Sequence, residues 1–332
     1  MALPRKGLHR LSCALTRQAS GCCVKAQSLL GNWRHRLQSN ELAKWRHAGE
    51  LARDALQYGR KLVTAGTDVL ASVDKIESYV RKNGGGLAFP VNIATDEEAA
   101  HWTPSSRTDR KFGAGELVKL DVGVEIEGYI GDNALTIEID GSQHDEMRDA
   151  ARDALQRVIE MTAPGVNTSL LGSAVQETIE SYGLRPVANL TGHGIKRYDL
   201  HCGLSIPSVS GFRGTVLRKD DVIAVEPFAT NGAGRVGGKR NSNIYHFVRS
   251  VRVRDSEAVE LLERIRSEFH GLPFAERWLH EFSDDPQPSL QKLLRAGAVA
   301  YFPVLDELGH GMVTQAEHTL LLTSSGVEVL TQ

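Results

Sequence analysis

The stretch Ala52-Arg53-Asp54-Ala55-Leu56-Gln57 returns later in the chain as Ala151-Arg152-Asp153-Ala154-Leu155-Gln156. Two further matches keep the same order: Thr64-Ala65-Gly66 with Thr162-Ala163-Pro164-Gly165, and Ile76-Glu77-Ser78-Tyr79 with Ile179-Glu180-Ser181-Tyr182. The three offsets are 99, 98 and 103 residues. One match alone would be weak evidence, but three in register predict two structurally related halves of about 100 residues each.

Each copy stands in helical sequence that is followed by strand-like sequence. Apolar residues from Leu42 onward recur at helical spacing up to Gly66, and a second helical pattern after Asp68 stops at Gly84. Residues 117–124 and 133–139 have the apolar pattern of strands. We therefore expect an α+β fold in which the two halves pack about a pseudo-two-fold axis, with a shared site between their sheets.

The composition is that of a globular protein and limits the partners. Of 332 residues, 41% are apolar and 24% are charged, and no apolar run approaches the roughly 18 residues of a membrane helix. Residues 1–40 hold seven Lys or Arg and no acid, which leaves 32 basic and 41 acidic residues in the remainder. An acidic body argues against a nucleic-acid partner, and no membrane partner is expected.

The basic segment 1–40 differs from everything after it. It has no sustained apolar period, and the spacing of Cys13, Cys22 and Cys23 fits no standard zinc motif. Such a segment buries too little apolar surface to offset its ordering entropy, so we expect a disordered extension. A native extension, a targeting segment and a start assigned too early all stay open. We expect a single folded domain over 41–332.

Residues 253–300 interrupt the pattern of the second half. Apolar residues between Val259 and Phe269 lie on one helical face. Residues 274–282 and 290–294 resemble two further short helices. We interpret this segment as a helical insertion in the second half.

Five residues of metal-ligating type stand at the ends of apolar strands or in turns. Asp121 and Asp132 flank the turn at Gly128, where a hairpin would place both on one face, although each alone is more typical of a turn residue. A glutamate after an apolar strand is costly to bury unless it is paired or metal-bound. Glycines around a histidine let the backbone approach a ligand closely. The complete set is Asp121, Asp132, His193, Glu226 and Glu317.

This oxygen-rich set with one imidazole suits a pair of divalent ions such as Mn²⁺, Fe²⁺ or Co²⁺. Two such ions a few ångströms apart turn water into a nucleophile and polarise a carbonyl group. The residues therefore favour a hydrolase with a dinuclear metal site.

Beyond these positions, a series of motifs resembles the methionine aminopeptidases of type 2, in their archaeal form. The resemblance runs from about Glu41 to Gln332. It implies the pita-bread fold, whose two related halves agree with the internal repeat, and a helical insertion that separates type 2 from type 1. The motifs are Phe89-Pro90-Val91-Asn92, Ala100-His101-Trp102-Thr103-Pro104, Lys119-Leu120-Asp121-Val122-Gly123, Gly131-Asp132, Thr191-Gly192-His193-Gly194-Ile195, Leu200-His201-Cys202-Gly203, Val225-Glu226-Pro227-Phe228 and Gln315-Ala316-Glu317-His318-Thr319.

The resemblance also implies how the ligands share two metal ions, which would be Co²⁺, Mn²⁺, Fe²⁺ or Zn²⁺. Asp121 would chelate one ion. Asp132 and Glu317 would bridge both ions, and His193 and Glu226 would complete the other. Glu226 would also carry a proton from water to the leaving amine, as an acid–base group must.

Further residues match the substrate site of that family. His101 and His201 match two histidines that do not bind metal, and they would hydrogen-bond the substrate and stabilise the tetrahedral oxyanion. Phe89, Leu200 and Phe302 match positions that line an apolar slot for methionine, although each would be a core residue by default. The implied function is removal of the N-terminal methionine from nascent polypeptides, at the ribosome, by a cytoplasmic monomer.

Two other functions stay open. A Xaa-Pro dipeptidase of the same fold uses the same five ligand types, but usually carries a substantial domain before its first ligand. Here only about 80 residues separate Glu41 from Asp121. A catalytically inactive binding protein on this scaffold would be expected to lack ligands, whereas all five are present.

Overall fold

The computed structural model describes residues 37–332. Residues 1–36 of the predicted basic extension, with its three cysteines, lie outside the described residues. The described part opens with Leu37, which packs against the buried cluster that contains Trp45, and the first helix starts at Ser39, two residues before Glu41. Over residues 37–332, no helix is both long enough and apolar enough to cross a bilayer.

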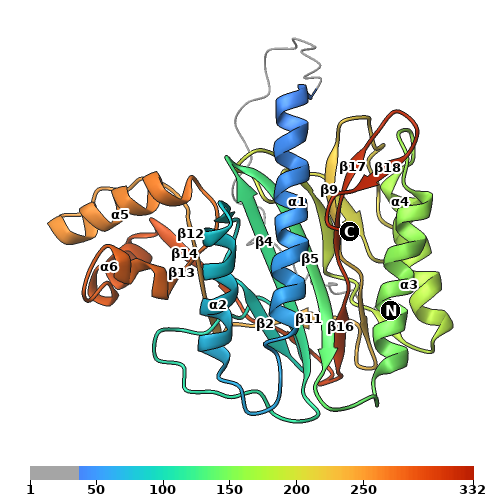
Figure 1. Ribbon diagram of the computed structural model, residues 1–332, viewed down its shortest axis with the longest axis horizontal. Helices are drawn as coiled ribbons and strands as arrows, with labels where there is room; N and C mark the ends of the chain where they lie inside the picture. The colour runs from blue at the N-terminus through green and yellow to red at the C-terminus, as the bar shows by residue number, and fades with distance from the viewer. Residues whose placement is uncertain (1–36) are drawn as a thin grey trace, which may run out of the picture. The chain divides into compact units, whose positions relative to one another are not determined.

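Two helices cover one face of an antiparallel sheet in the first half (Figure 1). The helices, α1 (Ser39–Arg60) and α2 (Val69–Lys82), share one core with the sheet. The helix predicted to reach Gly66 ends at Arg60, because the chain turns Val63 into this core and Gly66 adopts a positive φ of 80°. The sheet contains β1 (Gly86–Leu87), β2 (Asn92–Thr95), β4 (Leu117–Ile126) and β5 (Tyr129–Glu138), and β4 pairs with each of the others.

The second half repeats this arrangement. Helices α3 (Asp145–Met161) and α4 (Thr168–Ser181) share a second core with a five-stranded antiparallel sheet. In spatial order, that sheet contains β18 (Val327–Val329), β17 (His318–Leu322), β9 (Val222–Val225), β7 (Thr191–Ile195) and β8 (Ser205–Pro207).

The two helix pairs are equivalent down to single hydrogen bonds. The N–H of Gly66 donates to the carbonyl of Phe112, and the N–H of Gly165 donates to the carbonyl of Leu217, both at 2.8 Å. Each glycine has a positive φ, 80° and 95°, which is a conformation that favours glycine. The prediction of two related halves is confirmed. The repeated hexapeptides supply matching buried residues, namely Ala52, Ala55 and Leu56 in α1 and Ala151, Ala154 and Leu155 in α3.

Strand β5 joins the two halves along one edge. The N–H of Asp132 donates to Oγ1 of Thr319, and the same hydroxyl donates back to the carbonyl of Asp132, both at 2.8 Å. The N–H of Glu317 donates to the carbonyl of Ala134 at 3.0 Å. Side chains from both halves therefore meet along this contact, which we call the β5 seam (residues 132–136 with 315–319).

Two small three-stranded sheets complete the main body. One contains β16 (Val313–Gln315), β10 (Phe228–Thr230) and β6 (Arg185–Pro186), in that order. The other contains β11 (Val236–Gly237), β15 (Leu305–Glu307) and β3 (Glu98–Ala100).

The segment 241–303 has a hydrophobic core of its own. Helices α5 (Ser256–Phe269) and α6 (Gln287–Ala296) pack on a sheet formed by β13 (Phe274–Ala275), β12 (Asn241–Phe247) and β14 (Val299–Pro303), beside α2 in Figure 1. The short helix predicted over 274–282 is partly wrong. Phe274 pairs with Tyr245 across the sheet, and only Glu276–Glu281 is helical, as a 3₁₀ turn.

A buried ion pair fastens this segment to the first half. Arg277 pairs with Glu77 of α2 and donates to the Thr103 hydroxyl and the Pro104 carbonyl, both at 3.0 Å. Trp278 Nε1 donates to the other oxygen of Glu77 at 2.7 Å. Burial raises the pKa of Glu77, and the charge of Arg277 opposes this effect. The negative charge of the buried Glu77 carboxylate therefore depends on Arg277 for its compensation.

Replacing Arg277 with Met should lower the free energy of unfolding by about 3–5 kcal/mol, because it leaves a buried carboxylate unpaired. Chemical denaturation measures the change. Arg266→Met is the control, since Arg266 lies on α5 in an exposed pair with Glu263, for which the expected loss is under about 1 kcal/mol. Equal losses in the two variants would contradict the assignment.

Candidate metal centre

The first two candidate ligands lie on the hairpin of β4 and β5. In the register of that hairpin, Asp121 stands opposite Ala134 and Asp132 stands opposite Gly123. Residues directly opposite each other project to the same face, and so do residues two apart on one strand. Asp121 and Asp132 are therefore diagonal neighbours on one face of the sheet.

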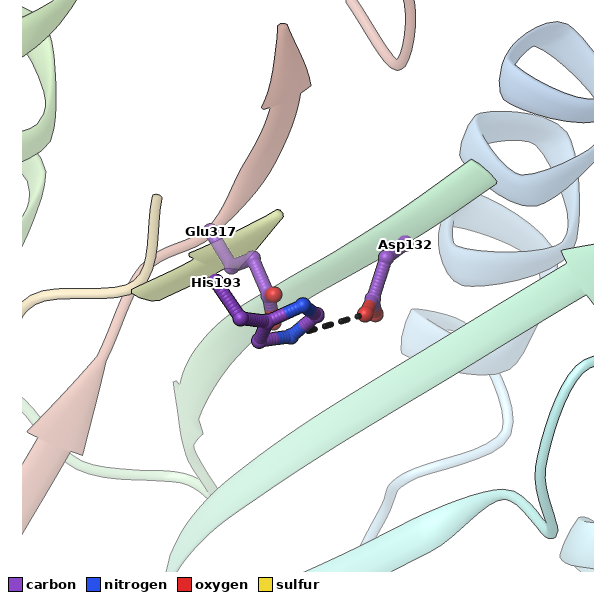
Figure 2. A group of neighbouring side chains, drawn as sticks. All are labelled: Asp132, His193 and Glu317. Atoms are coloured by element: carbon purple, nitrogen blue, oxygen red, sulfur yellow. Dashed lines mark ion pairs between the residues drawn. The ribbon is translucent and has the colours of Figure 1, made fainter. Parts of the chain in front are cut away.

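The other three candidates come from the second half. His193 lies in β7 opposite Ala224 of β9, so it is placed beside Glu226, which follows β9 directly. Glu317 sits between β16 and β17 at the β5 seam. Figure 2 shows the His193 ring with one nitrogen toward Asp132 and with the Glu317 carboxylate close to the ring. The ligand atoms of Asp132, His193 and Glu317 all lie within 4.8 Å of one another.

The distances between these ligand atoms are too long for hydrogen bonds and are similar to the distances between groups that bind a common ion. Nε2 of His193 lies 3.7 Å from Oδ2 of Asp132 and 3.8 Å from Oε1 of Glu226. Ligand atoms about 2.0–2.2 Å from a common ion stand at roughly such distances from each other. One carboxylate oxygen of Asp121 and one of Asp132 are buried without a hydrogen-bond partner.

Burial raises the proton affinity of each candidate carboxylate, a shift that a bound cation would reverse, and it lowers the proton affinity of the imidazole, a shift that a bound cation would reinforce. It raises the pKa of Asp132 to about 7. Burial and the neighbouring carboxylates raise the pKa values of Asp121, Glu226 and Glu317 well above their ordinary range. For His193, burial lowers the pKa to about 3, so the imidazole is neutral and keeps a lone pair for a metal. These residues fit a site for divalent cations.

A pocket adjoins the candidate ligands and contains the remaining predicted site residues. Phe89, Leu200 and Phe302 line it, together with His101 and His201. The His201 ring stands 4.4 Å from the His193 ring, and the His101 ring stands 5.3 Å from the ring of Phe302. Burial lowers the pKa of His101 to about 4. His101 also has a φ of 62°, a strained conformation for a residue with a side chain, and such strain is concentrated at functional sites.

Comparison with known proteins identifies the family of this site. A profile described as "Metallopeptidase family M24" matches residues 43–260. The chain belongs to this family. A methionine aminopeptidase of Pyrococcus horikoshii is 41% identical over 288 residues, which is 86% of this chain and 97% of the relative. The resemblance to methionine aminopeptidases is therefore confirmed, and divalent metal ions are the cofactors of the M24 metallopeptidases.

Solved structures of M24-type fold confirm the pita-bread architecture. A methionine aminopeptidase of Thermotoga maritima aligns with a TM-score of 0.66 at 23% identity, covering 89% of this chain and 98% of that one. A thermophilic Arx1 aligns with a TM-score of 0.79 at 15% identity, covering 89% and 91%. A prolidase of Pyrococcus furiosus aligns with a TM-score of 0.57 at 20% identity, covering 89% of this chain but 64% of that one.

Sequence reasoning missed four residues that line the same pocket. Ala100, Ile244 and Pro273 carry no chemical signal, and Ile244 and Pro273 enter the pocket from the segment 241–303. The fourth, Asn92, stands inside a motif that the sequence comparison used, but no role was predicted for it.

Metal-free protein should lose stability as the pH rises from about 6.5 to 8. Below this range the buried histidines oppose the trend, because the pKa values of His101 and His193 are lowered to about 4 and about 3, and their contribution grows as the pH rises towards the unfolded value of about 6.5. The acids of the site have folded-state pKa values above the unfolded value of about 4, so protonation favours the folded state. That stabilisation is complete below the unfolded pKa and is lost as the pH rises through the folded pKa, about 7 for Asp132. Melting temperatures of chelated protein across this range measure the loss.

Metal-loaded protein is the first control, because its carboxylates are already ionised and its melting temperature should change less. Asp132→Asn is the second, since it removes one of the titrating groups and should flatten the dependence of the chelated protein. A chelated protein with constant stability across this range would contradict the burial of these acids.

Proposed function

We propose that this chain is a dinuclear metalloaminopeptidase that removes the N-terminal methionine from polypeptides. The observation that carries the proposal is that the carboxylate–imidazole group and the apolar slot of Phe89, Leu200 and Phe302 line one pocket. The substrates would be the N-termini of nascent proteins, met in the cytoplasm and at the ribosome by a monomeric enzyme of type 2. The identity with named methionine aminopeptidases over most of both chains supports this substrate class.

The ligand allocation is the one that the resemblance to type 2 methionine aminopeptidases implies, and the positions of the side chains support it. Asp132 and Glu317 come from the two halves and meet at the β5 seam, so each could hold both ions. Asp121 would complete one ion, and His193 with Glu226 would complete the other. When bound, divalent ions of the Co²⁺, Mn²⁺, Fe²⁺ or Zn²⁺ class lower the pKa of a coordinated water and polarise the scissile carbonyl.

The protein residues supply proton transfer and orientation. A carboxylate oxygen of Glu226 would accept the proton of the attacking water and deliver it to the leaving nitrogen, so no net proton is gained or lost. His101 and His201 would donate hydrogen bonds to the substrate amide and to the tetrahedral oxyanion, an effect worth about 3–4 kcal/mol for one good donor. Burial lowers the pKa of His101 to about 4 and keeps its ring neutral, so one ring nitrogen can donate a hydrogen bond while the other accepts.

The apolar slot would select the side chain. Burial of a methionine side chain contributes about 1.5–3 kcal/mol, whereas a charged side chain would lie there without a partner. A Xaa-Pro dipeptidase remains the second candidate, but alignment with the prolidase leaves about a third of that chain unmatched, and the methionine aminopeptidase of Thermotoga maritima is covered almost completely. The presence of all five ligand types argues against an inactive binding protein.

The purified protein should release methionine from Met-Gly-Met-Met and leave a Gly-Pro dipeptide intact. Exhaustive chelation should abolish the activity, and Mn²⁺, Co²⁺ or Fe²⁺ should restore it better than Mg²⁺, which prefers an all-oxygen, hydrated octahedron. Released amino acid is quantified by chromatography. Cleavage of Gly-Pro but not of the methionine peptide would replace the proposal with the dipeptidase alternative.

Variants should separate the ligands from the other site residues. Asp132→Asn and Glu317→Gln should lose bound metal and activity together, because each removes a charged ligand that we assign to both ions. His201→Ala should lower kcat by about 10²–10³-fold through loss of one oxyanion donor, with metal content unchanged. Elemental analysis of dialysed protein gives the metal content. Loss of metal in His201→Ala would overturn the assignment.

A further inference from the structure

The side chain of Asn92 presents an unused hydrogen-bond acceptor in the pocket. Asn92 opens β2, is 5% exposed and lines the pocket with Phe89 and His101. Its register partner on β4 is Asp121, so the two side chains project to the same face of the sheet. The Oδ1 atom of Asn92 is buried and has no hydrogen-bond partner.

The orientation of this amide is fixed by its other contact. Nδ2 of Asn92 donates to the carbonyl of Pro90 at 2.9 Å. A carbonyl oxygen can only accept, so the NH₂ end of the amide must face Pro90 and the oxygen must face the other way. A buried acceptor without a donor destabilises the protein, so this arrangement favours a ligand that brings a donor to Oδ1.

The backbone that carries Asn92 is held on both sides. The N–H of Val91 donates to Glu77 at 3.3 Å, and the carbonyl of Val91 accepts from the Thr103 hydroxyl at 2.8 Å. Glu77 and Thr103 are in turn both bonded to Arg277. The Asn92 amide is therefore preorganised before any ligand arrives, which lowers the entropy cost of binding.

An N-terminal methionine offers three polar groups to this pocket: the α-amino group, the scissile carbonyl and the N–H of the next residue. Only the amino group and the N–H are donors. Asn92 stands opposite Asp121 in the ladder of β2 and β4, so it lies beside the candidate ligands, at the end of the pocket that would receive the first residue. The α-amino group belongs to that residue, whereas the N–H of the next residue lies beyond the scissile carbonyl, on the leaving side.

We propose that Asn92 is a substrate-binding residue whose Oδ1 accepts a hydrogen bond from the α-amino group of the N-terminal residue. The inference rests on the proposed aminopeptidase function and goes beyond it by assigning the recognition of a free N-terminus to this residue. A peptide that lacks the amine would leave Oδ1 unpaired, and an acylated amine would keep a single N–H with an acyl group added beside it. Asn92 thereby adds to the preference for free N-termini that the ligand geometry itself provides.

The test compares two inhibitors on metal-loaded enzyme: methionine hydroxamate and its desamino analogue, in which hydrogen replaces the amino group. Both keep the thioether and a metal-binding group, so both should bind the wild-type protein. Asn92→Ala should weaken methionine hydroxamate by about 10- to 100-fold, the usual effect of one hydrogen bond to a charged group, and leave the desamino analogue within about threefold. Inhibition constants against a methionine peptide give both values.

Asn133→Ala is the matched control. Asn133 is buried in β5, which pairs with β4 as β2 does. Its Nδ2 donates to the Val122 carbonyl at 2.9 Å and its Oδ1 also lacks a partner, but it does not line the pocket. This variant should change both inhibition constants by the same factor. If Asn92→Ala does not fold, Asn92→Ser carries the same expectation, because its hydroxyl can still donate to Pro90.

The outcomes separate this inference from the function on which it rests. A wild-type enzyme that cleaves the methionine peptide, with an Asn92→Ala variant that weakens both inhibitors equally or neither, overturns the role of Asn92 and leaves the function intact. That result would indicate that an ordered water or the fold alone uses Oδ1. A wild-type protein that cleaves no methionine peptide and binds neither inhibitor overturns the proposed function itself.

Discussion

The burial of four carboxyl groups and one imidazole at the seam between two halves is the constraint that the rest of this structure serves. Buried charges cost several kcal/mol each unless they are compensated. Within residues 37–332, the contacts of these acids with basic side chains are to the neutral His193, and no lysine or arginine pairs with them. A pair of divalent ions would supply the missing charge. Because both halves contribute ligands, metal binding would also strengthen the association of the halves.

The scaffold places these ligands with short elements held by backbone bonds. The reciprocal hydrogen bonds of the Asp132 backbone with the Thr319 hydroxyl fix the strand that carries this carboxylate relative to β17 of the other half. On the opposite side, the pairing of β7 with β9 sets His193 next to Glu226. The helices carry none of the five candidate ligands. Their role is to bury the outer faces of the sheets, which explains why the strongest internal repeat lies in the helices and not at the site.

Structural features that depend on the local sequence pattern could be predicted from the sequence. Features that depend on tertiary contacts could not. The repeated hexapeptides predicted the two halves, because matched buried faces require matched apolar residues. The end of α1 was predicted too late, because the sequence does not indicate that Val63 turns into the core after the helix ends. Residues 274–282 were predicted as a helix because nothing local indicates that Phe274 pairs with β12. Ile244 and Pro273 could not be predicted as pocket residues for the same reason.

Two separate structural systems govern the two ends of the pocket. The metal end depends on contacts between the halves at the β5 seam. The substrate end depends on the segment 241–303, which contributes Ile244, Pro273 and Phe302 and, through Arg277, fixes Glu77 and the backbone beneath Asn92. The two systems are joined where Asn92 stands opposite Asp121 in the ladder of β2 and β4, and where the ring of Phe302 lies 5.3 Å from the ring of His101. The strand that carries Asn92 therefore links the segment 241–303 to a candidate ligand. A change that loosens Glu77 and the backbone of Val91 would be expected to reach the Asp121 side of the pocket as well as the substrate side.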